Sequence, residues 1–293
     1  MAALAGRHRE PMVPRLERMQ QRQDTLKQAD VVLVLNGSPF EIDKDDKRQQ
    51  LVRELAVNNT AAVAYVNLVG GQDDLIFDGN SFFVTSRGDL VARAAQFEVG
   101  NTVIDITSST ECLANVLANE HPDDLGEIWG ALVLGLRDYI DKNGFKSVVL
   151  GLSGGIDSAV CAVLAADAIG GSRVFGVSMP SKYSSEHSRS DAEDSAERIG
   201  LNFRTEPIAD FVSVFESQLG LDGIAAENLQ ARMRGVILMG LSNDEGHLTL
   251  TTGNKTELAV GYSTIYGDSV GGFAPIKDVE KTLVWKLAKY IIY

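Results

Sequence analysis

The chain has 293 residues, of which 44% are hydrophobic and 23% are charged, and its net charge is −13. This composition excludes a disordered or collagen-like chain, and the length is sufficient for two domains. The acidic balance argues against nucleic acid as the main partner, because binding to a phosphate backbone requires a basic surface. No apolar stretch reaches the roughly 18 residues of a membrane span, and the N-terminus lacks the apolar core of a signal peptide. Two cysteines cannot form a disulfide framework, so we predict a cytoplasmic protein with neither nucleic acid nor membrane as a partner.

The first hundred residues predict a mixture of helices and strands. A polar segment at 15–28 predicts a helix, and the β-branched run at 29–35 predicts a buried strand. A second helix is predicted over 44–58 and a second strand over 61–69. Two further strands, at 81–85 and 90–94, flank the turn sequence SRGD and predict a hairpin.

The composition changes after residue 98. The polar and acidic segment from 98 to about 125 is typical of a connector between domains. Beyond it, strands and helices alternate along the chain. The strands are predicted at 146–152, 173–179, 202–208 and 247–252, and the helices at 125–142, 157–169, 186–199, from about 210, 227–241 and 278–291. Such alternation predicts a parallel sheet with helices on both faces and ligands at the carboxyl ends of the strands.

The sequence GLSGGIDS follows the strand at 146–152 and precedes an apolar helix. We call this segment, residues 151–158, the glycine loop. Its glycines allow a sharp turn with exposed amides, and the start of the following helix favours anions, so the loop predicts a phosphate cradle. The loop lacks the lysine of a Walker A motif. Asp157 beside phosphates indicates a Mg²⁺ ligand, although an aspartate here could also only cap the helix.

A second motif, TTGNKTE at 251–257, directly follows another strand. It can therefore lie beside the glycine loop, where Glu257 would supply a second carboxylate for the metal. The alternative is a helix start capped by Asn254 or Thr256. A third motif, ENLQARMR at 227–234, favours by its spacing alone a solvated charged helix face with Arg234 paired to an acid. The four histidines show no metal-ligand spacing, so we expect them at the surface or in the connector.

Taken together, these motifs resemble a known family. The glycine loop is similar to the pyrophosphate loop of N-type ATP pyrophosphatases, and ENLQARMRG, TTGNKTELAVGY and YGD…GGFAPIKDVEKT resemble NAD synthetase over about 125–293. The segments at 29–97, including LVLNGSPFEIDKDDKR, resemble the later half of the nitrilase-like glutaminase domain of glutamine-dependent NAD synthetases. The resemblance implies a partial nitrilase-like α+β sandwich at 1–100, a connector at 101–124 and an α/β synthetase domain, adenine nucleotide hydrolase-like, at 125–293.

The resemblance also implies a reaction and its residues. Deamido-NAD would be amidated to NAD at the expense of ATP, through an adenylate and with release of AMP and pyrophosphate. The implied contacts are grouped by ligand. The ATP contacts are Gly151, Leu152, Ser153, Gly154, Gly155, Ile156, Asp157, Ser158, Thr252 and Lys277. The deamido-NAD contacts are Asn228, Glu257 and Asp268, the Mg²⁺ ligands are Asp157 and Glu257, and the glutamine contacts are Ser38 and Lys44.

The chain departs from the family pattern in one respect. The family's glutaminase triad of Glu, Lys and Cys lies upstream of the NGSPF segment, and the residues before Asn36 contain no cysteine. Cys112 and Cys161 are not placed to act as the nucleophile, so we expect both to be packed small residues. We expect a chain that is incomplete at both ends relative to the family, with ammonia as nitrogen source if the glutaminase is inactive, and a homo-oligomer when intact.

Two alternatives remain at this point. One is another N-type ATP pyrophosphatase, such as GMP synthetase or a tRNA-thiolating enzyme, which the TGNKTE and YGD segments disfavour. The other is a non-catalytic fragment that only binds nucleotide.

Overall fold

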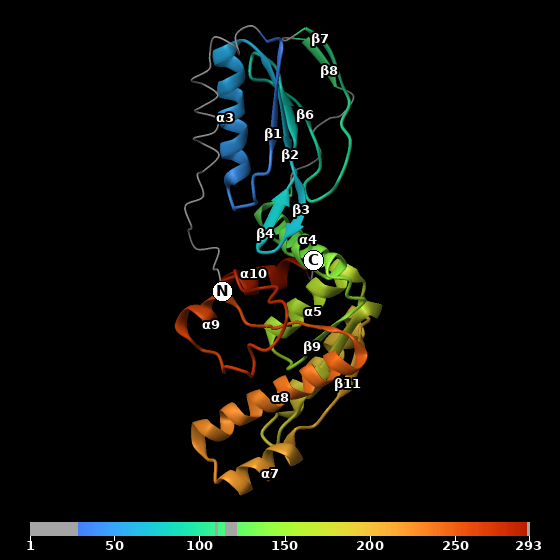
Figure 1. Cartoon of the computed structure of the whole chain (residues 1–293), viewed down its shortest axis with the longest axis vertical. Coiled ribbons are helices and arrows are strands. Elements are labelled where there is room, and N and C mark those ends of the chain that lie inside the picture. The colour runs from blue at the N-terminus through green and yellow to red at the C-terminus, as the bar shows by residue number, and fades with distance from the viewer. Residues whose placement is uncertain (1–28, 109–110, 115–121, 292–293) are drawn as a thin grey trace. The chain divides into compact units, whose positions relative to one another are not determined.

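The computed structural model describes residues 29–108, 111–114 and 122–291. The helix predicted over 15–28 lies outside these residues. The chain divides into two compact units, Met1–Gly135 and Leu136–Tyr293, and each is described by itself (Figure 1). Among the described residues, no helix combines the length and the apolar character needed to span a membrane.

The first unit is built on a four-stranded sheet in the order β1-β2-β5-β6. Strand β1 (Val31–Asn36) is parallel to β2 (Ala62–Asn67). Strands β5 (Phe82–Val84) and β6 (Leu90–Arg93) are antiparallel, which confirms the predicted hairpin. A smaller hairpin of β3 (Val69–Gln72) and β4 (Leu75–Asp78) follows β2.

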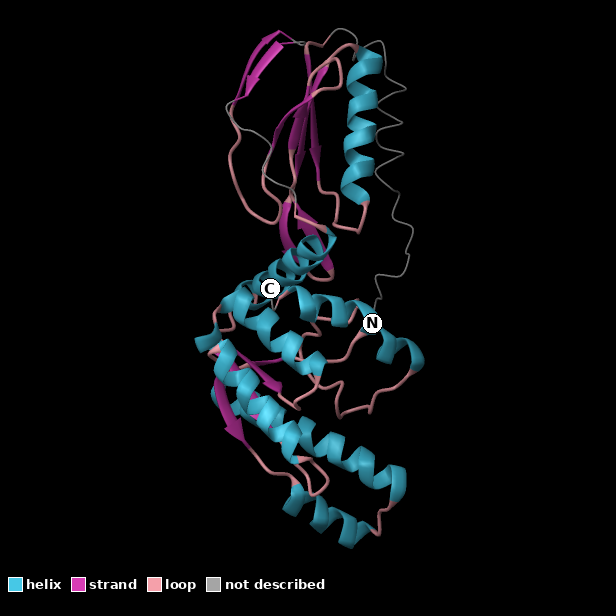
Figure 2. Cartoon of the chain, turned by 180° about the vertical axis from the view of Figure 1, so that it is seen from behind, coloured by secondary structure: helices cyan, strands magenta, loops and turns pink. Residues whose placement is uncertain are grey.

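Helix α3 (Lys44–Asn59) lies along the sheet of the first unit (Figure 2). Its buried residues Val52 and Leu55 pack with the inward side chains of β1 and β2, among them Val34 and Tyr65. Side chains alternate along a strand, so Val32 and Val34 face this core while Leu33 and Leu35 are exposed. The same buried helix face carries a charged residue, Arg48.

The segment expected to be a connector contains two strands. β7 (Ile104–Ser108) and β8 (Glu111–Ala114) form an antiparallel hairpin. Ile104 packs against a small core cluster that includes Phe83 and Ala92, and this apolar contact explains why a polar sequence is held in a strand. Helix α4 (Asp124–Lys142) then spans the boundary between the two units. The domain limits at 100 and 125 stay a prediction.

The second unit contains the predicted parallel sheet, in the order β11-β10-β9-β12. The strands are β9 (Val148–Gly151), β10 (Val174–Ser178), β11 (Asn202–Thr205) and β12 (Leu248–Thr249), and all neighbours are parallel. The α/β fold class is therefore confirmed.

The predicted helices of the second unit are also present: α5 (Ile156–Ile169), α6 (Glu186–Ile199), α7 (Ala209–Leu219), α8 (Gly223–Glu245) and α10 (Lys281–Tyr290). Val149 and Val177 project from the sheet into a core with Met233 and Leu238 of α8. Helix α5 also packs against β9 and β10.

The last strand is shorter than predicted, and a short helix follows it. Beyond Thr249, the Leu250 amide still donates to Val149, but the Thr251 amide turns to the carbonyl of Phe273. The chain therefore leaves the sheet after two paired residues. Helix α9 (Lys255–Val260) begins immediately afterwards, inside the TTGNKTE motif.

Candidate active site

The glycine loop connects β9 to α5 and places its backbone amides at the carboxyl end of the sheet. Gly154 has φ of +78°, and a Cβ there would lie 2.5 Å from the carbonyl oxygen of Ser188. Only glycine fits such a close backbone approach in the left-handed region. Ser158 Oγ donates to the Gly155 carbonyl at 2.8 Å, and the Gly155 amide donates to Ser153 Oγ at 3.2 Å. The loop is thus braced by its own hydroxyls. Gly155, not Asp157, is the N-cap of α5.

A cavity of about 400 Å³ opens beside this loop, which is a suitable size for a nucleotide. Its lining comes from four parts of the second unit: the glycine loop, the end of β10 with the start of α6, helix α8, and the segments around residues 251 and 267. The polar and charged residues of the lining include Ser153, Arg189, Arg234, Thr252 and Asp268, and Met179 lies among them. The predicted sites at Ser153, Thr252 and Asp268 are thereby brought to one cavity.

Asp157 is held by two residues distant in sequence. Its Oδ1 accepts a hydrogen bond from Asn254 Nδ2 at 3.1 Å, and its Oδ2 forms an ion pair with the ammonium of Lys281. The Asp157 side chain is 18% exposed and that of Lys281 is 36% exposed. The glycine loop and the TTGNKTE motif therefore meet, as predicted from the parallel strands. Lys281, the first residue of α10, was not predicted.

Glu257 belongs to the capping box of α9. Asn254 Oδ1 accepts from the backbone amide of Glu257 at 3.0 Å, and Glu257 Oε2 accepts from the backbone amide of Asn254 at 3.1 Å. The motif is therefore a helix start, as the alternative predicted, and its cap is Asn254 rather than Thr256. Thr256 Oγ1 instead accepts from the Lys281 amide at 3.0 Å. Asn254 consequently touches both predicted metal ligands.

The donor set suits magnesium. Within the described ranges, no group of three or more His, Cys, Asp or Glu residues is gathered to hold a metal. Mg²⁺ commonly uses only one or two carboxylates and takes its other ligands from phosphates and water. Asp157 and Glu257 can supply two such oxygens. In this structure Asp157 Oδ2 is paired with the Lys281 ammonium.

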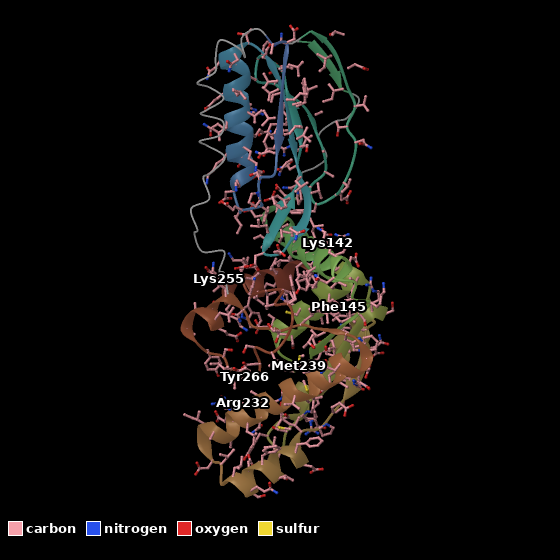
Figure 3. All side chains as sticks on the ribbon, in the orientation of Figure 1. Lys142, Phe145, Arg232, Met239, Lys255 and Tyr266 are labelled. Carbon is pink, nitrogen blue, oxygen red and sulfur yellow. The ribbon has the colours of Figure 1, made fainter. Side chains whose placement is uncertain are left out.

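The predicted deamido-NAD residues Asn228 and Asp268 are linked through Thr264. The Thr264 hydroxyl donates to Asn228 Oδ1 at 2.8 Å, and its amide donates to Asp268 Oδ1 at 2.7 Å. Arg232 Nε donates to the carbonyl of Ile265 at 3.2 Å, so α8 holds this turn next to Tyr266 (Figure 3). A polar surface is built here from two segments far apart in sequence.

Arg234 corrects the interpretation of the third motif. It lines the cavity and donates from Nε to the carbonyl of Met179 at 3.1 Å, rather than pairing with an acid on a solvated face. Burial lowers the pKa of the Arg234 guanidinium, which still remains a cation under all ordinary conditions. It therefore brings positive charge to the cavity and fixes the end of β10.

The two predicted lysine and threonine contacts differ in position. Thr252 lines the cavity, whereas Lys277 precedes α10 and is not among the cavity-lining residues of the described chain. Asp157, Glu257 and Lys281 are not among them either. Lys281, four residues later, is the lysine that reaches the glycine loop.

The cysteine and histidine expectations are confirmed in part. Cys161 is fully buried in α5, and burial raises the pKa of its thiol, which confirms a packing role. His187 is exposed. His247, however, is not at the surface: it is buried, and its ring contacts Ser147 Oγ at 2.6 Å and Glu245 at 3.0 Å. Cys112 lies in β8, while His8 and His121 fall outside the described residues.

The predicted glutamine contacts lie in the first unit around a buried ion pair. Arg48 NH1 donates to Asp78 at 2.6 Å, and these side chains are 2% and 1% exposed. Arg48 also donates to Ser38 Oγ and to the carbonyls of Ser38 and Pro39. Ser38 is only 4% exposed. Lys44 donates to Glu41 at 2.7 Å and to the Pro39 carbonyl at 3.0 Å.

A protein-family model described as NAD synthase matches residues 128–292, more than half of the chain. The chain belongs to the NAD synthase family. Among curated relatives, the glutamine-dependent NAD(+) synthetase of Acinetobacter baylyi is 45% identical over 267 residues, which cover 89% of this chain and 49% of the relative. The chain spans about half the length of the curated relatives it matches.

Solved members of the NAD synthase family share the fold. The glutamine-dependent NAD⁺ synthetase of Acinetobacter baumannii, solved in complex with ADP, is 44% identical and covers 95% of this chain and 54% of its own, with a TM-score of 0.90. The NH3-dependent NAD synthetase of Campylobacter jejuni is 32% identical and covers 59% of this chain and 75% of its own, with a TM-score of 0.56. These comparisons support the family resemblance that the motifs predicted.

Proposed function

We propose that the second unit catalyses the ATP-dependent amidation of deamido-NAD to NAD. The observation that carries this proposal is the contact between the two motifs, in which Asn254 of TTGNKTE binds Asp157 of the glycine loop 97 residues away, beside a nucleotide-sized cavity. Membership of the NAD synthase family supports the substrates. A relative bound to ADP supports the adenine nucleotide.

The reaction proceeds in two steps. A nicotinate carboxylate oxygen attacks the α-phosphorus of ATP, the bond to the bridging oxygen breaks, and pyrophosphate leaves. Ammonia then attacks the carbonyl carbon of the adenylate, loses a proton, and AMP leaves with the oxygen that came from the carboxylate. The chain contributes orientation and charge neutralisation rather than a covalent intermediate.

The residue roles combine what the resemblance implies with the contacts described above. Residues 151–158 bind the phosphates through backbone amides and hydroxyls, and Thr252, which follows the neighbouring strand β12, also contacts ATP. Lys277 stays the ATP contact that the resemblance implies, and Lys281, paired with Asp157, adds a cation beside the glycine loop. Asp157 and Glu257 hold Mg²⁺, which neutralises phosphate charge. Asn228, Glu257 and Asp268 face deamido-NAD.

Glutamine use by the first unit remains a separate proposal. The resemblance gives Ser38 and Lys44 as glutamine contacts, and the names of the curated relatives state glutamine dependence. Because Arg48 covers the Ser38 hydroxyl, glutamine can reach Ser38 only if this contact rearranges. The side chain of Lys44 is 17% exposed. We therefore expect ammonia to serve as the direct nitrogen donor.

We also propose that the protein forms a homo-oligomer. Helices α7 and α8 expose several large apolar side chains, and burial of such groups favours association. These residues are Phe211, Val214, Phe215, Leu219, Ile224 and Val236. Light scattering coupled to size exclusion measures the assembly, and a monomer at micromolar concentration contradicts this part of the proposal.

The reaction itself is tested by incubating the chain with ATP, deamido-NAD, ammonium and Mg²⁺. The proposal predicts equal amounts of NAD, AMP and pyrophosphate, and no turnover when xanthylate replaces deamido-NAD. ATP binding without NAD formation identifies a non-catalytic nucleotide-binding protein, and release of ADP instead of AMP contradicts adenylation.

A further inference from the structure

Asn254 is the most buried polar side chain in the proposed active site. It is 0% exposed, and both polar groups of its side chain as well as its backbone amide contact one of the two proposed metal ligands. Its Nδ2 donates to Asp157 at 3.1 Å, and its Oδ1 accepts from the backbone amide of Glu257 at 3.0 Å. The backbone amide of Asn254 donates to Glu257 Oε2 at 3.1 Å.

Helix capping explains only part of this arrangement. A cap needs a side-chain oxygen to accept the amide of the third helical residue, and Ser, Asp and Asn all provide one. Only asparagine among them adds an N–H₂ group that can donate in a second direction. That group is directed to Asp157. The contact between the TTGNKTE motif and the glycine loop, rather than the cap, therefore accounts for a side-chain amide at this position.

The same contacts leave one oxygen of each carboxylate without a contact to Asn254. Asn254 occupies Asp157 Oδ1 and Glu257 Oε2. Asp157 Oδ2 is then left to the Lys281 ammonium, and Glu257 Oε1 accepts no hydrogen bond from the described part of the chain. Because Asn254 is neutral, it holds the two carboxylates without adding negative charge beside the phosphates. Partners that fix metal-binding carboxylates in this way commonly contribute 10–100-fold to metal affinity or activity.

We propose that Asn254 is a positioning residue that orients Asp157 and Glu257 toward one divalent cation. The inference rests on the proposed function of the site, since it assumes that ATP binds there with Mg²⁺. It goes beyond that function by assigning metal affinity to a residue that touches neither the metal nor the nucleotide.

The test compares Asn254→Ser with Asn254→Ala in the full chain. Serine keeps the cap but lacks the donor to Asp157, whereas alanine lacks both. ATP binding is measured by calorimetry with Mg²⁺ and with EDTA, in the absence of deamido-NAD. We expect Asn254→Ser to melt near the wild-type temperature and to bind ATP in EDTA within twofold of wild type. The gain in ATP affinity on adding Mg²⁺ should fall about tenfold in both variants.

The outcomes separate the inference from the proposed function. A wild-type gain retained by Asn254→Ser and lost by Asn254→Ala reduces Asn254 to a helix cap and overturns the inference. No Mg²⁺-dependent gain in the wild-type chain contradicts the proposed metal site itself. If Asn254→Ser fails to fold, Asn254→Asp keeps both shape and cap but places a like charge against Asp157. It should show at least the same tenfold loss, and an undiminished gain overturns the inference.

Discussion

Lys281 and Asp157 are 124 residues apart in the sequence and form an ion pair at the glycine loop. The pair joins the first turn of α10 to the first turn of α5. It places a cation beside the loop that we propose to bind the ATP phosphates.

Replacing Lys281 with Met is expected to weaken ATP binding in EDTA by about tenfold, since a charge-assisted hydrogen bond of about 1.5–3 kcal/mol is lost. Lys286→Met is the matched control, because Lys286 is an exposed lysine on the same helix. It should change the ATP dissociation constant by less than about twofold, within the small effect of a surface charge. An equal or larger loss in Lys286→Met than in Lys281→Met contradicts this assignment.

Asp157→Asn and Glu257→Gln should each remove most of the Mg²⁺-dependent gain in ATP affinity. Glutamine keeps the capping box of α9, so Glu257→Gln tests the charge rather than the helix. Since both carboxylates act through one ion, the double variant should be little worse than either single variant. Calorimetric titration of ATP with Mg²⁺ measures these gains, and additive losses show that the two residues do not share a cation.

Arg48→Met is expected to destabilise the first unit by about 3–5 kcal/mol, because it leaves the Asp78 carboxylate buried without its partner. Burial already raises the pKa of Asp78 against the opposing effect of Arg48. Hydrogen exchange of the β2 amides measures the change. Arg48→Met with Asp78→Asn should recover at least half of the loss, and Arg53→Met, an exposed arginine on the same helix, should have little effect. Equal losses at Arg48 and Arg53 refute a role for the buried pair.

Glu245 predicts a pH dependence of stability. Hydrogen bonds from His247 and Arg204 lower the pKa of its carboxyl. A lowered pKa means that the charged form stabilises the fold above the unfolded-chain value of about 4.3 and that this contribution disappears as the pH falls through the folded-state pKa. Thermal melts should show wild type more stable than Glu245→Gln at pH 7, by at most about 1 kcal/mol because the carboxylate is near solvent. The difference should vanish in acid, and a constant difference down to pH 3 argues against the assignment.

The sequence predicts the parallel sheet because its strands are short β-branched runs separated by helices. This pattern is visible in the sequence without knowledge of any contact. The convergence of Asp157 with the TTGNKTE motif follows from the same topology. The contact of Lys281 with Asp157 does not, because it depends on where α10 begins and which way its first turn faces. The double contact of Asn254 also required the structure: a cap is visible in the sequence, but its second partner lies 97 residues away.

Burial was the property that the sequence predicted least well. His247 is expected from the sequence at the surface or in the connector, and no pattern in the sequence marks Arg48 as buried. Each is buried because its hydrogen-bonding partners come from other elements. Arg234 differs from its expected place on a charged face for the same reason, since the carbonyl of Met179 accepts its Nε proton. Spacing along one helix cannot reveal such partners.

We propose that the cavity of this chain adenylates the carboxylate of deamido-NAD. The most direct test uses deamido-NAD with ¹⁸O in both carboxylate oxygens, together with ATP, Mg²⁺ and ammonium, and mass spectrometry of the products. Attack on the α-phosphorus predicts AMP that carries one ¹⁸O atom, NAD that retains the other, and unlabelled pyrophosphate. Label in pyrophosphate, or AMP without label, contradicts the account.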